Sequence, residues 1–334
     1  MSGAVPSGFL ALPRVDSALA REVQDGLEKV EDVLRESVRA SDPMLTEAAS
    51  HLLEAGGKRF RAMLVLLAAH FGDPDMPDLV PAAAVVELTH VATLYHDDVM
   101  DEAELRRGKP SANQRWGNTI AILTGDYVFA KASEILADLG PEAVRLQAET
   151  FGRLVQGQIL ETSGPPEGVD PLDHYLRVIG DKTASLIASS AEFGGMFGKV
   201  DPVTTGTLTR ACDALGMAFQ LADDLIDVAA ETRESGKVPG TDLREGVLTL
   251  PMFYALRSTD PADDRLKSLL GRPLDDTEAE EALGLLRAHP AMAEAEKTLR
   301  GWSDKARAEL ATLPQGPARD AFEALCDYVV ERSG

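Results

Sequence analysis

The sequence has few cysteines and no apolar stretch long enough to cross a membrane. Cys212 and Cys326 are the only two, and both lie in apolar helical patterns without the spacing of metal ligands. We therefore expect buried free thiols, as in proteins of a reducing cytosol. The start, MSGAVPSGFLALPRVDS, has no basic residues ahead of its short apolar run. These absences predict a cytoplasmic protein with no integral membrane segment.

Positive charge is also scarce. The chain has 33 lysines and arginines against 55 aspartates and glutamates, a formal net charge of -22. Such a balance opposes binding to nucleic acid or to an anionic membrane surface. Any anion that the protein binds must be met by cations gathered locally.

Long linkers and strand-like patterns are missing as well. No long segment rich in Pro, Gly and Ser divides the chain, so we expect residues 1–334 to form a single domain, although length alone would suggest about two. Helical periodicity dominates, with loops expected at 72–78, 163–171 and 234–242. The pattern predicts a large all-α bundle with helices over 15–37, 77–100, 118–139, 141–162, 184–197 and 202–230.

Two DDxxD motifs interrupt strongly apolar helices, HVATLYHDDVMD and MAFQLADDLIDV. Carboxylates this close repel one another unless a cation lies among them, and oxygen-only ligands suit a hard ion, above all Mg²⁺. Solvated acidic faces are the simpler reading, but two copies inside apolar helices favour metal sites. The candidate ligands are Asp97, Asp98, Asp101, Asp223, Asp224 and Asp227, with Gln220 one turn before the second motif.

A basic segment, GGKRFR, opens the helix that continues as AMLVLLAAHF. Lys58 and Arg61 are three residues apart and share a helix face, with Arg59 beside them. Cations at a helix start oppose the helix dipole, a cost that reverses if a phosphate is held there. The segment is therefore a candidate anion site, although exposed surface charges with no binding role are the simpler interpretation.

Further cations follow the acidic motifs. Arg106 and Arg107 come about one and a half turns after the first motif, where they would pair with its carboxylates, grip a phosphate, or pair within the helix with Glu102 and Glu104. The remaining candidates are Lys182 and Thr183 in GDKTASL, Lys237 in a Gly/Pro loop, and His90 two turns before Asp97.

With these motifs in order, GGKRFR, HVATLYHDDVMDEAELRRG, GDKTASL, FQLADDLID and GKVPGTDLREGVLTLP, the sequence resembles the trans-isoprenyl diphosphate synthases over about residues 56–251. The resemblance implies an all-α isoprenoid-synthase-type helical bundle around a central cavity, usually a homodimer. It implies condensation of isopentenyl diphosphate with an allylic diphosphate, head to tail and in trans, with Mg²⁺ as cofactor.

The resemblance also assigns roles to the candidate residues. The six aspartates would hold Mg²⁺ on the allylic diphosphate, assisted by Arg106, Lys182, Thr183, Gln220 and Lys237. Isopentenyl diphosphate would be bound by Lys58, Arg59, Arg61, His90 and Arg107. Two departures from the family pattern are Ala62, where Pro is common, and Val247, where a second Lys is common.

The residues before Asp97 would set product length. Ala92 and Thr93 lie about 6–8 Å below the metal site at the helical rise, and both are small where short-chain members often carry aromatics. The resemblance thus favours a medium or long product, hepta- to decaprenyl, unless a side chain of another helix closes the end (the floor) of the cavity that holds the growing chain. The alternatives are a short-chain farnesyl or geranylgeranyl synthase, a terpene cyclase, and a non-catalytic regulatory subunit of a heteromeric synthase.

Overall fold

The computed structural model describes residue 10 and residues 14–229 and 239–332. Within these residues every element is helical apart from one small hairpin, so the all-α prediction is confirmed. The chain divides into two compact units, and the division falls inside three long helices, α8 (Pro141–Ser163), α11 (Pro202–Ala229) and α17 (Pro317–Glu331). That residues 1–334 act as a single domain stays a prediction.

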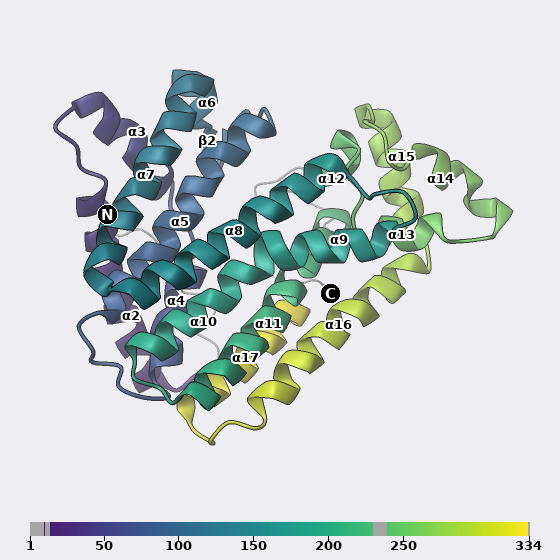
Figure 1. Ribbon diagram of the computed structural model, residues 1–334. Helices are drawn as coiled ribbons and strands as arrows, with labels where there is room; N and C mark the ends of the chain where they lie inside the picture. The colour runs from purple at the N-terminus through teal and green to yellow at the C-terminus, as the bar shows by residue number, and fades with distance from the viewer. Residues whose placement is uncertain (1–9, 11–13, 230–238, 333–334) are drawn as a thin grey trace. The chain divides into compact units, whose positions relative to one another are not determined.

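Unit 1 comprises residues 1–152, 186–210 and 312–324. Its long helices α5 and α7 lie side by side (Figure 1). Its whole elements are α2 (Ser17–Ser37), α3 (Pro43–Glu54), α4 (Phe60–Ala69), α5 (Leu79–Met100), β1 (Leu105–Arg106), β2 (Lys109–Pro110), α6 (Ala112–Trp116) and α7 (Asn118–Leu139), joined by almost all of α10 (Ser185–Phe197).

Local sequence explains how these helices begin and what they bury. Asp16 caps α2 by accepting hydrogen bonds from the backbone N–H groups of Ala18 and Leu19, at 2.9 and 3.0 Å. The apolar stripe of α2 is buried at every third or fourth residue, as a surface helix requires. In contrast, α5 is buried on nearly all sides, which makes it the central helix of unit 1.

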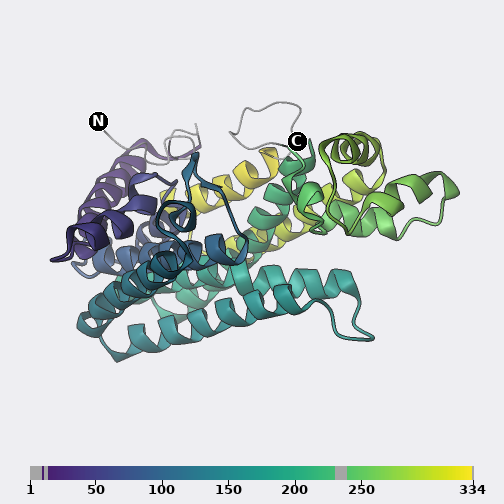
Figure 2. The same cartoon turned by 90° about the horizontal axis from the view of Figure 1, so that it is seen from above.

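Unit 2 comprises residues 153–185, 211–311 and 325–334. Helices α13, α14, α15 and α16 pack against one another at one end of it (Figures 1 and 2). Its elements are α9 (Pro171–Ile179), the π-helix η1 (Gly180–Ala184), α12 (Thr241–Glu245), α13 (Leu250–Leu256), the 3-10 helix η3 (Pro261–Asp263), α14 (Asp264–Leu269), α15 (Asp276–Arg287) and α16 (Ala291–Leu310).

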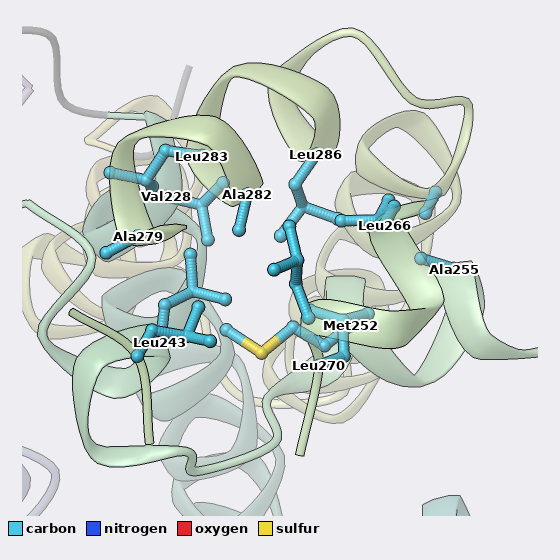
Figure 3. Close-up of a cluster of buried hydrophobic side chains, with 13 residues drawn as sticks. Val228, Leu243, Met252, Ala255, Leu266, Leu270, Ala279, Ala282, Leu283 and Leu286 are labelled. Atoms are coloured by element: carbon cyan, nitrogen blue, oxygen red, sulfur yellow. The ribbon is translucent and has the colours of Figure 1, made fainter. Parts of the chain in front are cut away.

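A cluster of buried apolar side chains holds this end of unit 2 together. Leu243, Met252, Leu266 and Leu286 come from four different helices and point toward one another (Figure 3). Val228, at the end of α11, belongs to the same cluster, so the helix that carries the second aspartate motif is anchored in this core.

The predicted helices, and the loops at 72–78 and 163–171, agree with the structure to within about two residues at their ends. The loop predicted at 234–242 lies largely outside the described residues, and its last two residues, Thr241 and Asp242, begin α12. One local prediction was wrong. Lys58 and Arg59 precede α4, which begins at Phe60, because Arg59 adopts a left-handed conformation with φ 45°. The helix predicted over 77–100 ends at Met100, and Arg106 and Arg107 lie beyond it in the β1–β2 hairpin, so of the three roles considered for them the pairing within a helix with Glu102 and Glu104 does not occur. No helix in the described ranges is long and apolar enough to span a bilayer.

Candidate active site

The first aspartate motif ends α5 in unit 1. Asp98 is fully buried. Its Oδ1 accepts a hydrogen bond from Nε of Arg106 at 2.6 Å and forms an ion pair with Nη2 at the same distance. Its Oδ2 is buried and has no hydrogen-bond partner among the described residues. Burial raises the pKa of Asp98 although Arg106 opposes the shift. Asp97 is half-buried and Asp101, the C-cap of α5, is exposed, so the motif runs from the core to the surface.

The hairpin places two arginines against this motif. Arg107 and Gly108 form its two-residue loop with φ 53° and 74°, the left-handed pair of a type I′ turn. Arg107 reaches back to α3 and donates to the carbonyls of Leu52, at 3.0 Å, and of Gly56. A Cβ at Gly57 would lie 3.0 Å from Nη1 of Arg107, so a glycine at 57 leaves room for the guanidinium.

Four arginines act on His90, which lies two turns before the first motif on α5. Burial, and then the charges of Arg61, Arg107, Arg106 and Arg59, lower the pKa of this half-buried imidazole well below its usual value. The Nε of Arg61 is buried and has no hydrogen-bond partner in the described part of the chain. Cations this crowded repel one another and favour an anion among them.

Arg59 differs from its neighbours because it is buried and its guanidinium contacts groups of the protein itself. It is 3% exposed and forms an ion pair with Glu31, donates to the Leu53 carbonyl at 3.1 Å, and lies 3.9 Å from a Glu87 oxygen. Burial opposes its charge, but Glu31 and Glu87 outweigh this and raise the pKa of Arg59. Direct binding of substrate by Arg59 stays a prediction.

The second aspartate motif lies on α11 in unit 2 and is held by donors of the protein itself. Asp224, 6% exposed, accepts hydrogen bonds from the hydroxyl of Tyr175 and from Gln220 Nε2 at 3.0 Å. Burial raises the pKa of Asp224 to about 6 against these hydrogen bonds. Asp223 forms an ion pair with Arg332, near the end of α17.

Asp227 connects the motif to the segment that follows. Its two carboxylate oxygens accept from the backbone N–H groups of Thr241 and Asp242, both at 3.2 Å, and its carbonyl accepts from Gly240 at 2.9 Å. Asp227 therefore stabilises the first turn of α12, which has no side-chain cap from its own N-cap residue. Lys237 lies outside the described residues.

Lys182 and Thr183 sit in the π-helical turn between α9 and α10. Thr183 Oγ1 donates to Gln220 Oε1 at 3.2 Å, so the turn contacts the second motif, and Lys182 pairs with Glu161. A Cβ at Gly157 on α8 would lie 2.6 Å from the backbone nitrogen of Lys182. Gly157 thus permits the close approach of α8 to this turn. Isolated π-turns often mark functional sites.

The aspartates are oxygen donors of the kind that a hard divalent ion requires. The unpaired, buried Oδ2 of Asp98 fits such an ion because a bound cation would satisfy it. The described residues contain no group of three or more His, Cys, Asp and Glu side chains already arranged around a metal position. The carboxylates of the second motif point instead at Arg332, Tyr175 and backbone N–H groups. The six aspartates remain predicted ligands.

The residues expected to set product length are closely packed. Ala92 is 1% exposed, and Thr93 is half-buried with its hydroxyl bonded to the His90 carbonyl at 2.8 Å. One turn further, the buried Thr89 hydroxyl accepts a hydrogen bond from Gln147 Nε2 at 2.7 Å. The Gln147 Oε1 has no hydrogen-bond partner among the described residues. A polar pair from α5 and α8 therefore lies below the small residues.

The sequence reasoning missed four residues that organise these two regions, Glu87, Gln147, Gly157 and Tyr175. Glu87 and Gln147 had a detectable signal, a polar residue on the apolar face of a helix. Tyr175 and Gly157 had none, because each is defined by a partner on another element.

The profile of the polyprenyl synthetase family matches residues 42–286. A nonaprenyl diphosphate synthase of Mycobacterium tuberculosis is 50% identical over 321 residues, 96% of this chain and 96% of that protein. The chain belongs to the polyprenyl synthetase family. The predicted family and its class of reaction, prenyl transfer, are thereby confirmed.

Solved structures of this family agree with the fold. A geranylgeranyl pyrophosphate synthase of Corynebacterium glutamicum, complexed with calcium and isoprenyl diphosphate, has a TM-score of 0.86 at 43% identity and covers 96% of this chain and 98% of its own. A decaprenyl diphosphate synthase of Rhodobacter capsulatus has the same TM-score at 37% identity, covering 95% and 99%.

Proposed function

We propose that this polyprenyl synthetase condenses isopentenyl diphosphate with an allylic diphosphate, head to tail and in trans, to make an all-trans polyprenyl diphosphate of medium or long chain, hepta- to decaprenyl. The observation that carries this proposal is the group of arginines around His90, directly beside the buried Asp98. A chain with net charge -22 gathers cations there, which an anion-binding site explains.

Each of the two diphosphate substrates is bound by its own set of residues in this proposal. The isopentenyl diphosphate is bound by Lys58, Arg61, His90 and Arg107, with Arg59 supporting them from inside. A neutral His90 donates one N–H to a phosphate oxygen, and the arginines offer paired N–H groups of matching geometry. The allylic diphosphate is held at the aspartate motifs with Arg106, Lys182, Thr183, Gln220 and Lys237.

The reaction needs charge stabilisation and positioning rather than a nucleophilic side chain. Bound Mg²⁺ supplies positive charge that stabilises the departing diphosphate. Arg106 and Lys182 would each add positive charge that stabilises the diphosphate as the allylic C–O bond breaks, and the arginines around His90 would hold isopentenyl diphosphate for attack on the allylic cation. Proton loss to the departing diphosphate restores an alkene.

Product length is proposed from the small residues of α5 and from the nonaprenyl relative. Ala92 lies five residues before Asp97, and replacing it with Phe would narrow the path of the growing chain. We expect Ala92→Phe to shorten the product, read by reversed-phase chromatography of the dephosphorylated prenols. An unchanged product distribution would mean that position 92 does not limit the length of the product.

A short-chain product is the second candidate, favoured by one contact. Thr89 is eight residues before Asp97, about 12 Å down the helix, and its bond to Gln147 closes α5 against α8 at that depth. The geranylgeranyl synthase of Corynebacterium glutamicum is also among the similar structures. Gln147→Ala lengthens the product if this pair is the floor and leaves it unchanged if the floor lies deeper.

We also propose a homodimer in the cytoplasm. Ile122 and Leu123 on α7 are 42% and 56% exposed, so both apolar side chains are available for contact with a second copy of the chain. The two cysteines are buried and free, in keeping with a reducing compartment. Sedimentation of the wild type and of Leu123→Glu tests the dimer.

One assay tests the function. Purified protein is given Mg²⁺, labelled isopentenyl diphosphate and each allylic starter in turn, and the product is separated by chain length, with a chelator control. Consumption of both substrates into one all-trans series is expected. A cyclic hydrocarbon from a single prenyl substrate would identify a cyclase, and no turnover without another subunit would identify a regulatory or heteromeric component.

A further inference from the structure

Glu87 is a buried carboxylate of unit 1 to which the reaction assigns no role. It lies on α5, three residues before His90, and is 2% exposed. Its Oε1 accepts a hydrogen bond from the backbone N–H of Ala62 at 3.1 Å, and its Oε2 lies 3.9 Å from Nη1 of Arg59. Buried carboxylates are retained where they meet donors or counter-charges, and on one segment Glu87 meets a donor, the Ala62 N–H, and a counter-charge, the Arg59 guanidinium.

That segment is the start of α4, which has no cap of its own. Its N-cap residue is Arg59, in a left-handed conformation with φ 45° and no side-chain cap bond. The first N–H groups of a helix need acceptors, and Glu87 supplies one from the neighbouring helix. The backbone that carries Lys58, Arg59 and Arg61 is thus tied to α5 through Glu87.

Glu87 is also a counter-charge for the arginines. Its charge supports the protonated form of Arg61 and of Arg107, whereas burial lowers the pKa of both. Arg59 is paired with Glu31 from the other side. A buried carboxylate facing several arginines lowers their mutual repulsion before any phosphate arrives.

We propose that Glu87 is a positioning residue: it holds the first turn of α4 and its arginines in the arrangement that receives the diphosphate of isopentenyl diphosphate. This inference rests on the proposed function. It concerns one of the two substrates, because Glu87 contacts none of the aspartates of either motif among its hydrogen bonds and ion pairs described above.

Glu87→Gln separates charge from size. The amide oxygen still accepts from the Ala62 N–H, but the amide NH₂ group faces the Arg59 guanidinium, donor against donor. We expect the KM for isopentenyl diphosphate to rise roughly tenfold or more, as when one partner of a buried charge pair is lost. The KM for the allylic substrate should change by less than about threefold, since residues that share no contacts couple weakly and Glu87 contacts neither aspartate motif.

A binding measurement accompanies the kinetics. Calorimetric titration of isopentenyl diphosphate into metal-free protein should show the same loss of affinity, independent of turnover. Glu87→Asp keeps the charge on a shorter side chain and should restore part of the affinity. Glu192→Gln on α10 is the matched control: Glu192 is half-buried, its charged neighbour is Glu149 rather than an arginine, and its removal should leave both KM values unchanged.

Each outcome decides the matter. Unchanged affinity in Glu87→Gln overturns the inference, as does tighter binding, which would mean that Glu87 repels the phosphate. Equal increases in both KM values with a large loss of thermal stability would mean a general structural role and would overturn it too. Should Glu87→Gln not fold, Glu87→Asp alone decides by the same KM comparison. If the wild type neither binds nor consumes isopentenyl diphosphate, the proposed function fails first.

Discussion

The first and second aspartate motifs share the pattern DDxxD but differ in what surrounds their carboxylates. In the first, one oxygen of Asp98 accepts from Arg106, the other has no hydrogen-bond partner among residues 14–229 and 239–332, and a group of arginines lies nearby. In the second, Asp224 is bonded to Tyr175 and Gln220, and Asp227 to backbone N–H groups.

The difference teaches that one motif can serve two electrostatic purposes. The first region combines an unsatisfied buried oxygen with excess positive charge, so it gains most from binding a cation and an anion together. The second region is satisfied without a ligand, so its aspartates also support the local fold, Asp227 by capping α12. Substitutions in the two regions should therefore have different consequences.

The largest effect is expected at Asp98. Asp98→Asn keeps the shape but removes the charge that a metal and Arg106 both use, so kcat should fall by about 10²–10³, as when a charge-stabilising group of an active site is lost. The matched change Asp227→Asn should lower kcat far less and act mainly on stability, because it replaces one of the two carboxylate oxygens that accept from the first turn of α12 with an amide donor. Steady-state kinetics at saturating substrates and Mg²⁺ measure both. Equal losses of kcat would remove the distinction between the two motifs.

A smaller effect is expected at Tyr175. Tyr175→Phe leaves the buried Asp224 with one hydrogen bond fewer, which should reduce the free energy of unfolding by about 1–3 kcal/mol. Urea denaturation without metal measures it. The loss should shrink when Mg²⁺ and pyrophosphate are present, because a bound cation replaces the missing donor. A loss that is the same with and without them would mean that Asp224 does not meet the metal.

The pKa of His90 tests whether the first region binds an anion. Its folded-state pKa lies below the unfolded value of about 6.5, so neutral His90 contributes stability that is present above pH of about 6.5 and is lost as pH falls below it through the folded pKa. Isopentenyl diphosphate should raise that pKa, because its negative charge offsets the arginine charges. NMR titration of the imidazole, assigned with His90→Gln, measures both values. A pKa that does not move on binding would place the diphosphate elsewhere.

The smallest effect is expected at Arg332. Arg332→Met keeps an apolar stem over Phe219, where the guanidinium lies 4.8 Å from the ring centre, but frees Asp223. The apparent affinity for Mg²⁺ should increase about two- to fivefold, the range of a partly exposed ion pair. Arg319→Met, which breaks an ion pair with Glu323 on the same helix, is the control. A weaker Mg²⁺ affinity would mean that Arg332 helps the motif rather than competing for it.

Much of the site could be predicted because its residues follow local rules. Asp97 and Asp101 are four apart on one helix, and the spacing alone places them on one face. The same reasoning put Lys58 and Arg61 on one helix face, but α4 begins only at Phe60, so Lys58 lies outside the helix. The hairpin that carries Arg106 and Arg107 was not predicted, because a left-handed pair at Arg107 and Gly108 has no signature in hydrophobic periodicity.

The sequence by itself determined the all-α fold, the family and the residues that carry charge, since helix periodicity and motif spacing are local properties of the chain. Only the tertiary structure decided which of those charges are satisfied. Glu87 meets the Ala62 N–H across 25 residues and Tyr175 meets Asp224 across 49. Partners that far apart are brought together by helix packing, and no local pattern records which buried polar group will find which donor.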